Sequence, residues 1–305
     1  MEIYPKPSSR EAVSVASELG KLYGTLDLPV RDTPIPLFLI ISGSGPTDRD
    51  GNSAMLRKKN DSLKMLGGWL TSFGGAALRY DKRGIGESKD AAGDVSTVTF
   101  ENMISDARLW IDMMKDDPRF STIHIIGHSE GSLVGICAAG AGDVESFISI
   151  AGAGRPISII LREQFEGQPG FIRRKAEPIL AELEKGNRVD RVPFLLKKAF
   201  APDLQPYLLS WMKYDPPAEL AKLDIPCLVL QGTTDIQTSH VDARFLAEAG
   251  STCTLAFVEG MNHILKDAPA AKMKNIRTYM KENLPLSNNL VEELRVFFEN
   301  QSLLP

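Results

Sequence analysis

The chain has 305 residues, of which 43% are hydrophobic and 24% charged, and its formal net charge is −4. This composition is typical of a globular protein with a sizeable core, and the length suits two domains or one large α/β domain with an insertion. The slightly acidic balance favours neither nucleic acid nor an anionic membrane as a partner, and no apolar stretch is long enough to span a bilayer.

The N-terminus and the cysteines indicate where the protein resides. The segment "MEIYPKPSSREAVSV" (1–15) has no apolar region typical of a signal peptide. Cys137, Cys227 and Cys253 are odd in number and lie in apolar contexts, which favours buried, reduced thiols over a disulfide framework. We therefore expect a cytoplasmic protein; a secreted form that has already lost its signal is the alternative.

Predicted strands and helices alternate along the chain. The first are a strand at 21–29, a continuous apolar strand at 36–42 and a helix at 62–73, where Leu63, Leu66 and Leu70 lie at helical spacing. The rest, in chain order, are strand 75–80, helix 100–117, strand 122–126, helix 129–139, strands 146–152 and 225–232, helix 240–249, strand 253–260, and helices 267–283 and 288–300. This order predicts an α/β fold with a mostly parallel, doubly wound sheet flanked by helices.

One interval interrupts the alternation. Residues 154–222 have helical character and no convincing strand, with helical pieces near 155–185, 190–200 and 203–213. A connection this long in a compact domain is usually functional. We predict that 154–222 is an inserted helical cap and that 1–153 and 223–305 form the core. Aromatic residues of the cap are expected to bury it on the core, and a few to line an apolar pocket: Phe165, Phe171, Phe194, Phe200, Tyr207, Trp211 and Tyr214.

The segment "GHSEG" (127–131) has the pattern G-x-S-x-G between a predicted buried strand and a predicted helix. In that context a serine lies in a strained turn at the start of the helix, where neighbouring side chains would collide with the crossing backbone. The sequence therefore predicts a nucleophilic Ser129 rather than an ordinary tight turn.

A serine nucleophile needs a base, and the base needs an acid that orients it. Of the four histidines, we expect His124 in the core, His128 inside the turn and His240 at a helix start. His263 follows the last strand and is the predicted base. Asp235 follows the strand at 225–232 and is the predicted acid; Asp267 and Glu259 are rivals. All three predicted catalytic residues lie at carboxyl ends of parallel strands, where such sheets bind ligands.

At these residues the chain resembles a known superfamily. The segments "IIGHSEGS", "LQGTTDIQT" and "MNHILKDAP" look like the nucleophile, acid and histidine loops of α/β-hydrolases. More narrowly, "IISGSGPTDRDGNS" (40–53) and "LRYDKRGIGES" (78–88) resemble bacterial serine esterases related to prolyl-oligopeptidase-like hydrolases. The resemblance extends from about Leu22 to Phe298 and is weakest in the cap.

The resemblance implies an oxyanion hole. One donor would be the backbone N–H of Glu130, and the second that of Ser44, with Gly43 as the alternative. In "DRDGN" (48–52) the acidic and amide side chains are expected to bind local backbone, whereas Arg49 is a candidate for the pocket, as is Gly43. The carboxylate of Glu130 has no role that the sequence indicates.

These residues predict a carboxylesterase of the serine-hydrolase type that acts on small acyl esters through an acyl-enzyme. It needs no cofactor and no metal, and has no nucleic-acid or membrane partner. A peptidase or thioesterase using the same triad is an alternative, although hydrolase strands begin near residue 21 without the propeller domain of prolyl-type peptidases. A non-catalytic binding protein of the same fold is the other alternative. The physiological substrate and the oligomeric state are not indicated by the sequence.

Overall fold

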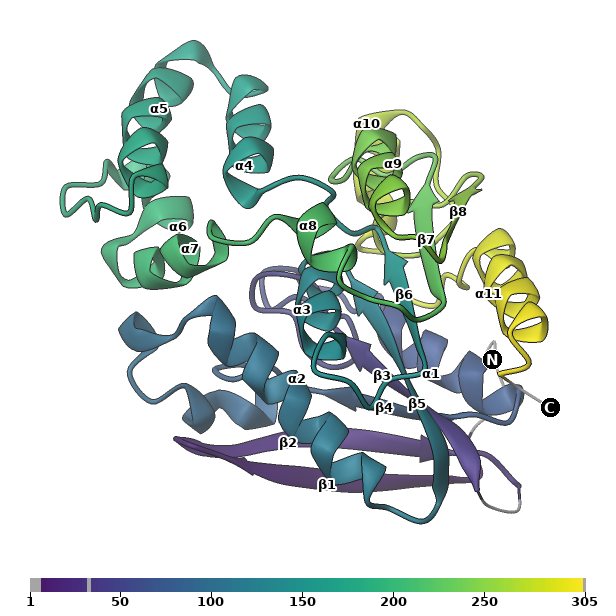
Figure 1. The fold of residues 1–305 in the computed structure, drawn as a ribbon. Coiled ribbons are helices and arrows are strands. Elements are labelled where there is room, and N and C mark those ends of the chain that lie inside the picture. Colours follow the sequence, from purple (N-terminus) through teal and green to yellow (C-terminus); the bar gives the residue numbers. More distant parts are fainter. Residues whose placement is uncertain (1–6, 32–33, 304–305) are drawn as a thin grey trace.

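A computed structural model describes residues 7–31 and 34–303. Its strands are β1 (Ser9–Ser17), β2 (Gly20–Leu28), β3 (Ile35–Ile41), β4 (Ala76–Tyr80), β5 (Phe120–His128), β6 (Ser146–Ile150), β7 (Cys227–Gly232) and β8 (Cys253–Val258). They form one eight-stranded sheet in the order β1-β2-β4-β3-β5-β6-β7-β8 (Figure 1). β2 pairs antiparallel with β1 and β4, and the other neighbours are parallel. The predicted mostly parallel sheet is confirmed.

Helices cover both faces of the sheet. The longer helices outside 154–222 are α1 (Ser62–Ser72), α2 (Phe100–Lys115), α3 (Glu130–Ala139), α9 (His240–Ala249) and α11 (Asn288–Asn300). Successive side chains of a strand point to opposite faces. On β3, Leu37 and Leu39 therefore pack in the layer of α2, α3 and α9, whereas Phe38 and Ile40 pack in the layer of α1 and α11. This doubly wound arrangement agrees with the sequence prediction.

β1 was not predicted. Its register with β2 runs from Ser9 opposite Leu28 to Ser17 opposite Gly20. Val13 and Val15 alternate with smaller or polar residues and pack against the core, which is the period-two signal of a half-buried strand. That short alternation was the sequence signal for β1, and its antiparallel pairing with β2 makes the segment a strand of the sheet.

The predicted helix at 267–283 is wrong at both ends, because only α10 (Lys272–Thr278) is helical there. Asp267 instead pairs with Met261 in an isolated antiparallel bridge, and the N–H of Ala268 donates to the carbonyl of Gly260 at 2.9 Å. The backbone at Asp267 and Ala268 therefore forms a bridge with the preceding segment, and the helix begins only at Lys272.

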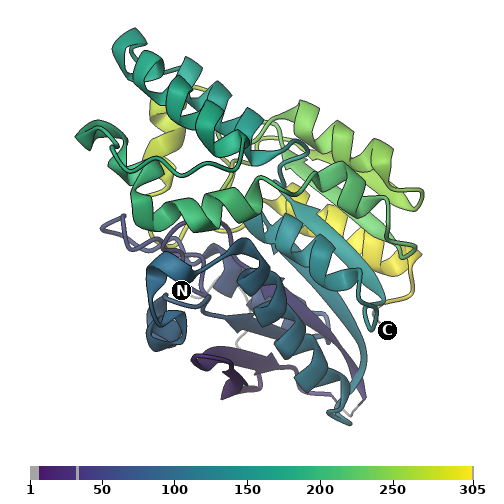
Figure 2. The ribbon, with the colours of Figure 1, turned by 60° about the vertical axis from the view of Figure 1, so that its left-hand side comes forward.

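Between 154 and 222 the described chain is helical and contains no strand. Its elements are α4 (Ile157–Glu166), α5 (Gly170–Glu184), the short α6 (Lys197–Phe200), α7 (Gln205–Trp211) and α8 (Pro216–Leu220). The piece predicted at 155–185 is divided at Gly167–Pro169, where proline favours a break in the helix. Ala176, Leu180 and Phe200 belong to a hydrophobic cluster separate from the two cores of the sheet. Figures 1 and 2 show α4 and α5 standing away from the sheet.

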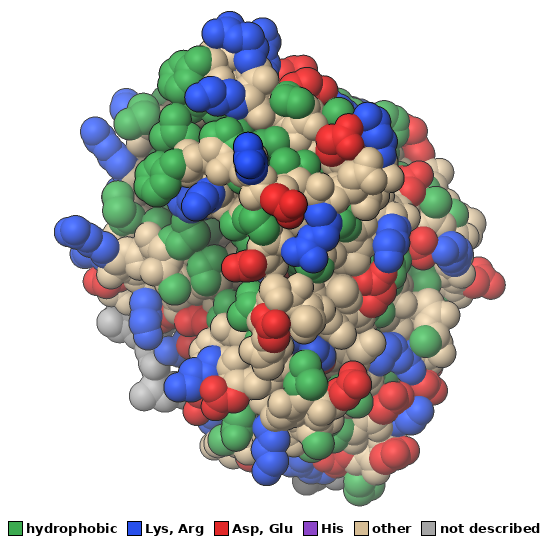
Figure 3. All heavy atoms as spheres, turned by 90° about the vertical axis from the view of Figure 1, so that its left-hand side faces the viewer, with side chains coloured by type: hydrophobic (Ala, Val, Ile, Leu, Met, Phe, Trp, Pro, Cys, Tyr) green, Lys and Arg blue, Asp and Glu red, His purple; other side chains and the backbone are tan. Residues whose placement is uncertain are grey.

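The aromatic residues of this segment have three different environments. Trp211 stacks on Phe100 of α2 with centroids 5.5 Å apart, and Tyr207 and Tyr214 also contact Phe100. Phe165 and Phe200 stack inside the separate cluster. The expected burial is wrong for Phe171 and Phe194, which are 49% and 85% exposed. Figure 3 faces this side of the molecule and shows hydrophobic side chains gathered near its top among lysines and arginines.

All three cysteines are free, as predicted. Cys227 is buried, but Cys137 and Cys253 are partly exposed, so the predicted burial is wrong for those two. Among residues 7–31 and 34–303, no helix combines the length and the apolar character needed to cross a bilayer.

Candidate active site

Ser129 lies in a sharp turn between β5 and α3. Its backbone has φ 56° and ψ −120°, a conformation that a residue with a side chain rarely adopts. The Ser129 N–H donates to the carbonyl of Ile150 at 2.9 Å, which ties the turn to the end of β6. The strain predicted from the motif is therefore present at the serine itself.

The two glycines that flank the serine are required by close backbone contacts. A Cβ at Gly127 would come within 2.6 Å of Ser132 Cα, and a Cβ at Gly131 within 2.7 Å of the Ser42 carbonyl oxygen. Real Cβ atoms essentially never approach other atoms this closely. The strand and helix can thus cross at this distance only because both positions lack a side chain.

Asp235 and His263 meet at the same edge of the sheet. His263 Nδ1 lies 2.8 Å from Asp235 Oδ2, and their side chains are 7% and 1% exposed. Asp235 also accepts hydrogen bonds from the N–H groups of Gln237 (2.7 Å) and Thr238 (3.2 Å) and from Thr238 Oγ1 (2.9 Å). Burial alone would raise the pKa of Asp235, but the His263 imidazole and these donors outweigh it and lower that pKa to about 2. Asp235 is therefore a carboxylate at neutral pH.

The rival acids are placed differently. Asp267 and Glu259 are both exposed, whereas among the described residues it is Asp235 that accepts a hydrogen bond from a ring nitrogen of His263. The structure records no hydrogen bond between Ser129 Oγ and His263 among the described residues, although catalytic contacts of this kind often tighten only when substrate is bound.

The other histidines have structural surroundings. His128 Nε2 lies 2.7 Å from the carbonyl oxygen of His263, and the two rings are 4.9 Å apart. Burial, followed by the charge of His263, lowers the pKa of His128 to about 3, so its ring is neutral and can donate to that carbonyl. His124 is buried between Thr122 and Ser146, and His240 begins α9. His128 thus holds the backbone of His263 above the turn that carries Ser129.

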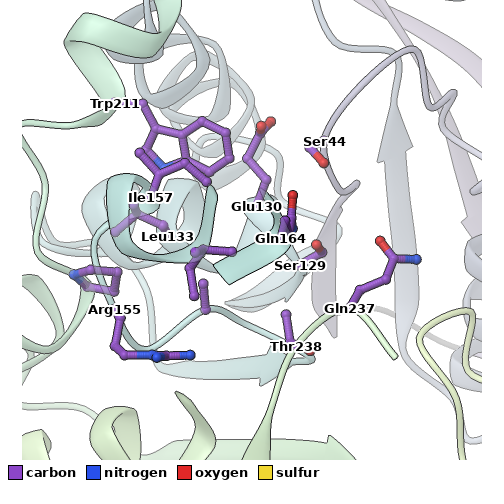
Figure 4. Close-up of a pocket in the computed structure, with 13 residues that line it drawn as sticks. Ser44, Ser129, Glu130, Leu133, Arg155, Ile157, Gln164, Trp211, Gln237 and Thr238 are labelled. Atoms are coloured by element: carbon purple, nitrogen blue, oxygen red, sulfur yellow. The ribbon is translucent and has the colours of Figure 1, made fainter. Parts of the chain in front are cut away.

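The loop after β3 passes directly beside the serine. A Cβ at Gly43 would lie 3.1 Å from Ser129 Cβ and 3.2 Å from His128 Nδ1. Ser44 and Glu130 line the same cavity as Ser129 (Figure 4). Glu130 is the first residue of α3, and the first N–H groups of a helix have no intrahelical acceptor. Both predicted oxyanion donors therefore belong to residues at the nucleophile.

A buried lysine connects the loop after β3 with the start of α3. Lys82 Nζ donates to the carbonyl oxygens of Gly43 and Gly45, the latter at 3.3 Å, and lies 3.5 Å from Glu130 Oε1. The side chains of Lys82 and Glu130 are 7% and 3% exposed. Burial raises the pKa of Tyr207 on α7, and the charge of Glu130 and a hydrogen bond to its carboxylate raise it further. The Glu130 carboxylate thus has the partners that the sequence did not indicate.

In the "DRDGN" loop the expected contact with local backbone is present at Asp48, but it is wrong for Asp50, whose carboxylate pairs with the Arg79 guanidinium. Asp48 accepts the N–H groups of Asp50 (3.0 Å) and Asn52 (2.8 Å). Arg49 is not among the residues that line the cavity at Ser129. Its guanidinium pairs with Asp81 at 2.6 Å and with Glu87, so the pocket role predicted for Arg49 has no support in this cavity.

The cavity beside Ser129 is small, with a volume of about 70 Å³. Apolar side chains group on one side of it and Ser44 and Gln237 lie on the other (Figure 4). The apolar lining comprises Leu133, Ala153, Ile157, Ile160, Trp211 and Pro216. Arg155 also lines it, but its guanidinium is paired with Asp242 at 2.9 Å and with Glu163. Within the described ranges no three His, Cys, Asp or Glu side chains are grouped so as to hold a metal ion.

A protein family and a known esterase resemble this chain in sequence. A family model described as serine aminopeptidase S33 matches residues 60–164. Esterase EstD of Thermotoga maritima is 27% identical over 284 residues, which cover 89% of this chain and 65% of that esterase. The chain therefore spans slightly less than two thirds of the length of that relative.

Solved structures share the fold. GrgF from Penicillium sp. sh18, an α/β hydrolase, matches with a TM-score of 0.62 at 16% identity, covering 96% of this chain and 99% of that chain. Est1E from Butyrivibrio proteoclasticus matches with a TM-score of 0.58 at 17% identity, covering 88% of this chain and 96% of that chain. The chain therefore shares the fold of these hydrolases.

Two features of this site were missed by the sequence analysis. Lys82 lies in "LRYDKRGIGES", which was recognised only as part of a resemblance, and no spacing links it to Gly43 or Glu130. The contact of His128 with His263 spans 135 positions. The one local signal for Lys82 was an acidic residue beside the nucleophile, because a buried carboxylate requires a partner.

Proposed function

We propose that this protein is an α/β hydrolase of the serine carboxylesterase type that acts on esters with small acyl groups. The observation that carries the proposal is the strained Ser129 at the end of β5 beside the buried Asp235–His263 hydrogen bond of 2.8 Å. The similarity to Esterase EstD over 89% of this chain supports the same reaction class.

In the proposed mechanism His263 acts as general base and then as general acid. It removes the Ser129 proton while Oγ attacks the ester carbonyl, and it then protonates the leaving alcohol. Water enters, gives a proton to His263 and attacks the acyl-enzyme, and Ser129 leaves with that proton. Asp235 keeps the proton of His263 on Nδ1, so that Nε2 is free to accept, and stabilises the imidazolium that forms.

The backbone N–H groups of Ser44 and Glu130 are the proposed oxyanion donors. They would stabilise the negative charge that develops on the carbonyl oxygen in both tetrahedral intermediates. Removal of one such donor typically costs about 3 kcal/mol of transition-state stabilisation.

Residues 154–222 are proposed to act as a cap that limits the acyl group. Ile157, Ile160 and Trp211 come from this segment and line the cavity of about 70 Å³ beside Ser129. Pockets for drug-sized ligands are roughly 300–1,000 Å³. The small apolar cavity therefore favours short acyl chains over long ones.

A peptidase is the second candidate, because the family model that matches residues 60–164 is described as serine aminopeptidase S33. Amide hydrolysis uses the same nucleophile, but an amine is a poorer leaving group than an alcohol and must be protonated to leave. Matched p-nitrophenyl esters and p-nitroanilides with the same acyl group separate the two: amide kcat/KM comparable with that of the ester would support the peptidase.

The test of the proposal uses Ser129→Ala and an active-site label. We expect hydrolysis of p-nitrophenyl acetate to fall by at least 10³-fold, and a fluorophosphonate to modify Ser129 alone. Wild-type hydrolysis by Ser129→Ala, or labelling of another residue, would refute it. Tight binding of small esters without turnover would favour a non-catalytic binding protein.

A further inference from the structure

The ammonium of Lys82 has three N–H donors and three acceptors in the structure. These are the carbonyl oxygens of Gly43 and Gly45 and the carboxylate of Glu130. A buried cation is costly unless it is paired and hydrogen-bonded. Here Lys82 has two backbone acceptors and one carboxylate partner, and all three groups belong to the two segments that border Ser129.

The contact with Gly43 determines where the next N–H points. The carbonyl of Gly43 and the N–H of Ser44 belong to one planar, trans peptide unit, in which C=O and N–H point in opposite directions. Because Lys82 holds the carbonyl oxygen, the Ser44 N–H must point away from Lys82. This favours Ser44 over Gly43 as the second oxyanion donor.

The segment that Lys82 holds contains two glycines, so its backbone has few steric constraints. Ser44 lies between two glycines, and Gly45 has φ 70°, a region that glycine enters freely. Without the lysine, the Gly43–Ser44 peptide could rotate at little steric cost. On the other side, Glu130 receives both Lys82 and the hydroxyl of Tyr207, so α7 is linked to the same cluster.

We propose that Lys82 and the Glu130 carboxylate are positioning residues that hold the Ser44 and Glu130 N–H groups in register as one oxyanion hole. This inference rests on the proposed serine-hydrolase function and deepens it. Neither side chain is assigned a contact with substrate. The N–H groups bind the charge that develops in the transition state. Loss of Lys82 or of the Glu130 carboxylate should therefore raise the free energy of the transition state and hardly change substrate binding.

Lys82→Met keeps the length of the side chain and removes its donors. We expect kcat for p-nitrophenyl acetate to fall by roughly 10²-fold, the scale of one lost oxyanion donor, with KM changed by less than about three-fold. Glu130→Gln retains an acceptor, so we expect a smaller loss of about ten-fold. The double variant should lose no more than Lys82→Met alone, since the two act as a unit.

Asp106→Asn is the matched control. Arg83, the next residue after Lys82, makes a buried pair with Asp106 through bonds of 2.8 and 2.6 Å, and the side chains are 4% and 1% exposed. This pair connects to α2 and not to the Gly43–Gly45 segment. Asp106→Asn should therefore lower the melting temperature while kcat stays within about two-fold.

A second measurement does not depend on ester turnover. Fluorophosphonate labelling forms a bond between Ser129 Oγ and phosphorus, releases fluoride, and develops charge on the phosphoryl oxygen. We expect its rate to fall in Lys82→Met in parallel with kcat. Each variant is first shown to be folded by circular dichroism; if Lys82→Met does not fold, Glu130→Gln carries the test.

The outcomes separate the two proposals. If the wild type lacks Ser129-dependent hydrolysis and labelling, the proposed function and this inference both fail. If the wild type reacts normally and folded Lys82→Met reacts at the same rate, only this inference is overturned. A loss confined to KM, or an equal loss in Asp106→Asn, also overturns it, because either result would indicate a general structural role.

Discussion

Replacing Asp235 by asparagine tests the assignment of the catalytic acid. The carboxylate accepts four hydrogen bonds, from His263 Nδ1, the N–H groups of Gln237 and Thr238, and Thr238 Oγ1. An amide retains one accepting oxygen and places an N–H₂ donor among these groups. If that donor faces His263, the imidazole must carry its proton on Nε2, and it can no longer accept the proton of Ser129.

The size of the effect can be estimated for both activity and stability. Loss of the correct tautomer in an intact triad lowers kcat by about 10⁴-fold. The pKa of Asp235 is about 2, compared with a usual value of 3.8, so its carboxylate stabilises the fold by about 2 kcal/mol. Because this pKa is lowered, the stabilisation is present above about pH 4 and is lost as the pH falls toward 2. At neutral pH, Asp235→Asn should lose it fully.

The assay is steady-state hydrolysis of p-nitrophenyl acetate at neutral pH, with urea unfolding of the same samples. Asp267→Asn is the control, because Asp267 is the rival acid, lies in the loop that carries His263 and is exposed. We expect that control to retain kcat within two-fold. Asp235→Asn with more than a tenth of wild-type kcat, while Asp267→Asn is impaired, would refute the assignment of Asp235.

Three further predictions concern the turn, the cavity and the buried histidines. Gly131→Ala should greatly reduce fluorophosphonate labelling of Ser129, since its Cβ would lie 2.7 Å from the Ser42 carbonyl, whereas Gly167→Ala, whose Cβ has no neighbour nearer than 3.8 Å, should label normally. Trp211→Ala should increase kcat/KM for octanoate relative to acetate esters at least ten-fold, since about 0.8 kcal/mol is gained per buried CH₂; an unchanged ratio in an acyl-length series contradicts the cavity assignment. Burial lowers the pKa of His124 from 6.5 to about 4, so as the pH falls the unfolded state binds a proton before the folded state does. The free energy of unfolding should therefore decrease by about 1.4 kcal/mol for each pH unit as the pH falls from 6.5 to 4. Urea titrations should show a smaller slope for His124→Gln, and an identical slope would count against a neutral buried ring.

Much of the fold was predictable because its signals are local. The apolar run of β3 and the leucine spacing of α1 each reflect one element packing on one or two faces. The nucleophile turn was predictable for the same reason, since Gly127 and Gly131 lie within four residues of each other. Elements whose ends depend on distant contacts were predicted less well, as with the helix expected at 267–283, where the bridge of Asp267 to Met261 shortens it.

The candidate site divides in the same way. Ser129, Asp235 and His263 could be selected by their positions after three strands, because parallel strands bring their carboxyl ends to one edge. The partners of side chains that reach across the fold could not be selected. Arg49 could equally face a cavity or a carboxylate in a polar loop, and the structure pairs it with Asp81, 32 positions away.

The sequence by itself determined the order of strands and helices, the glycine-flanked serine and the residue types of the candidate triad, because these depend on spacing along the chain. Tertiary structure alone decided the surroundings of that serine. The cavity of about 70 Å³ exists because Ile157 and Trp211 return to the strand ends. Lys82 holds the Gly43 carbonyl because two loops separated by 39 positions meet there, and Glu130 obtains its cationic partner by the same contact. Burial forces such charges to find partners, but only the packed chain determines which partners lie within reach.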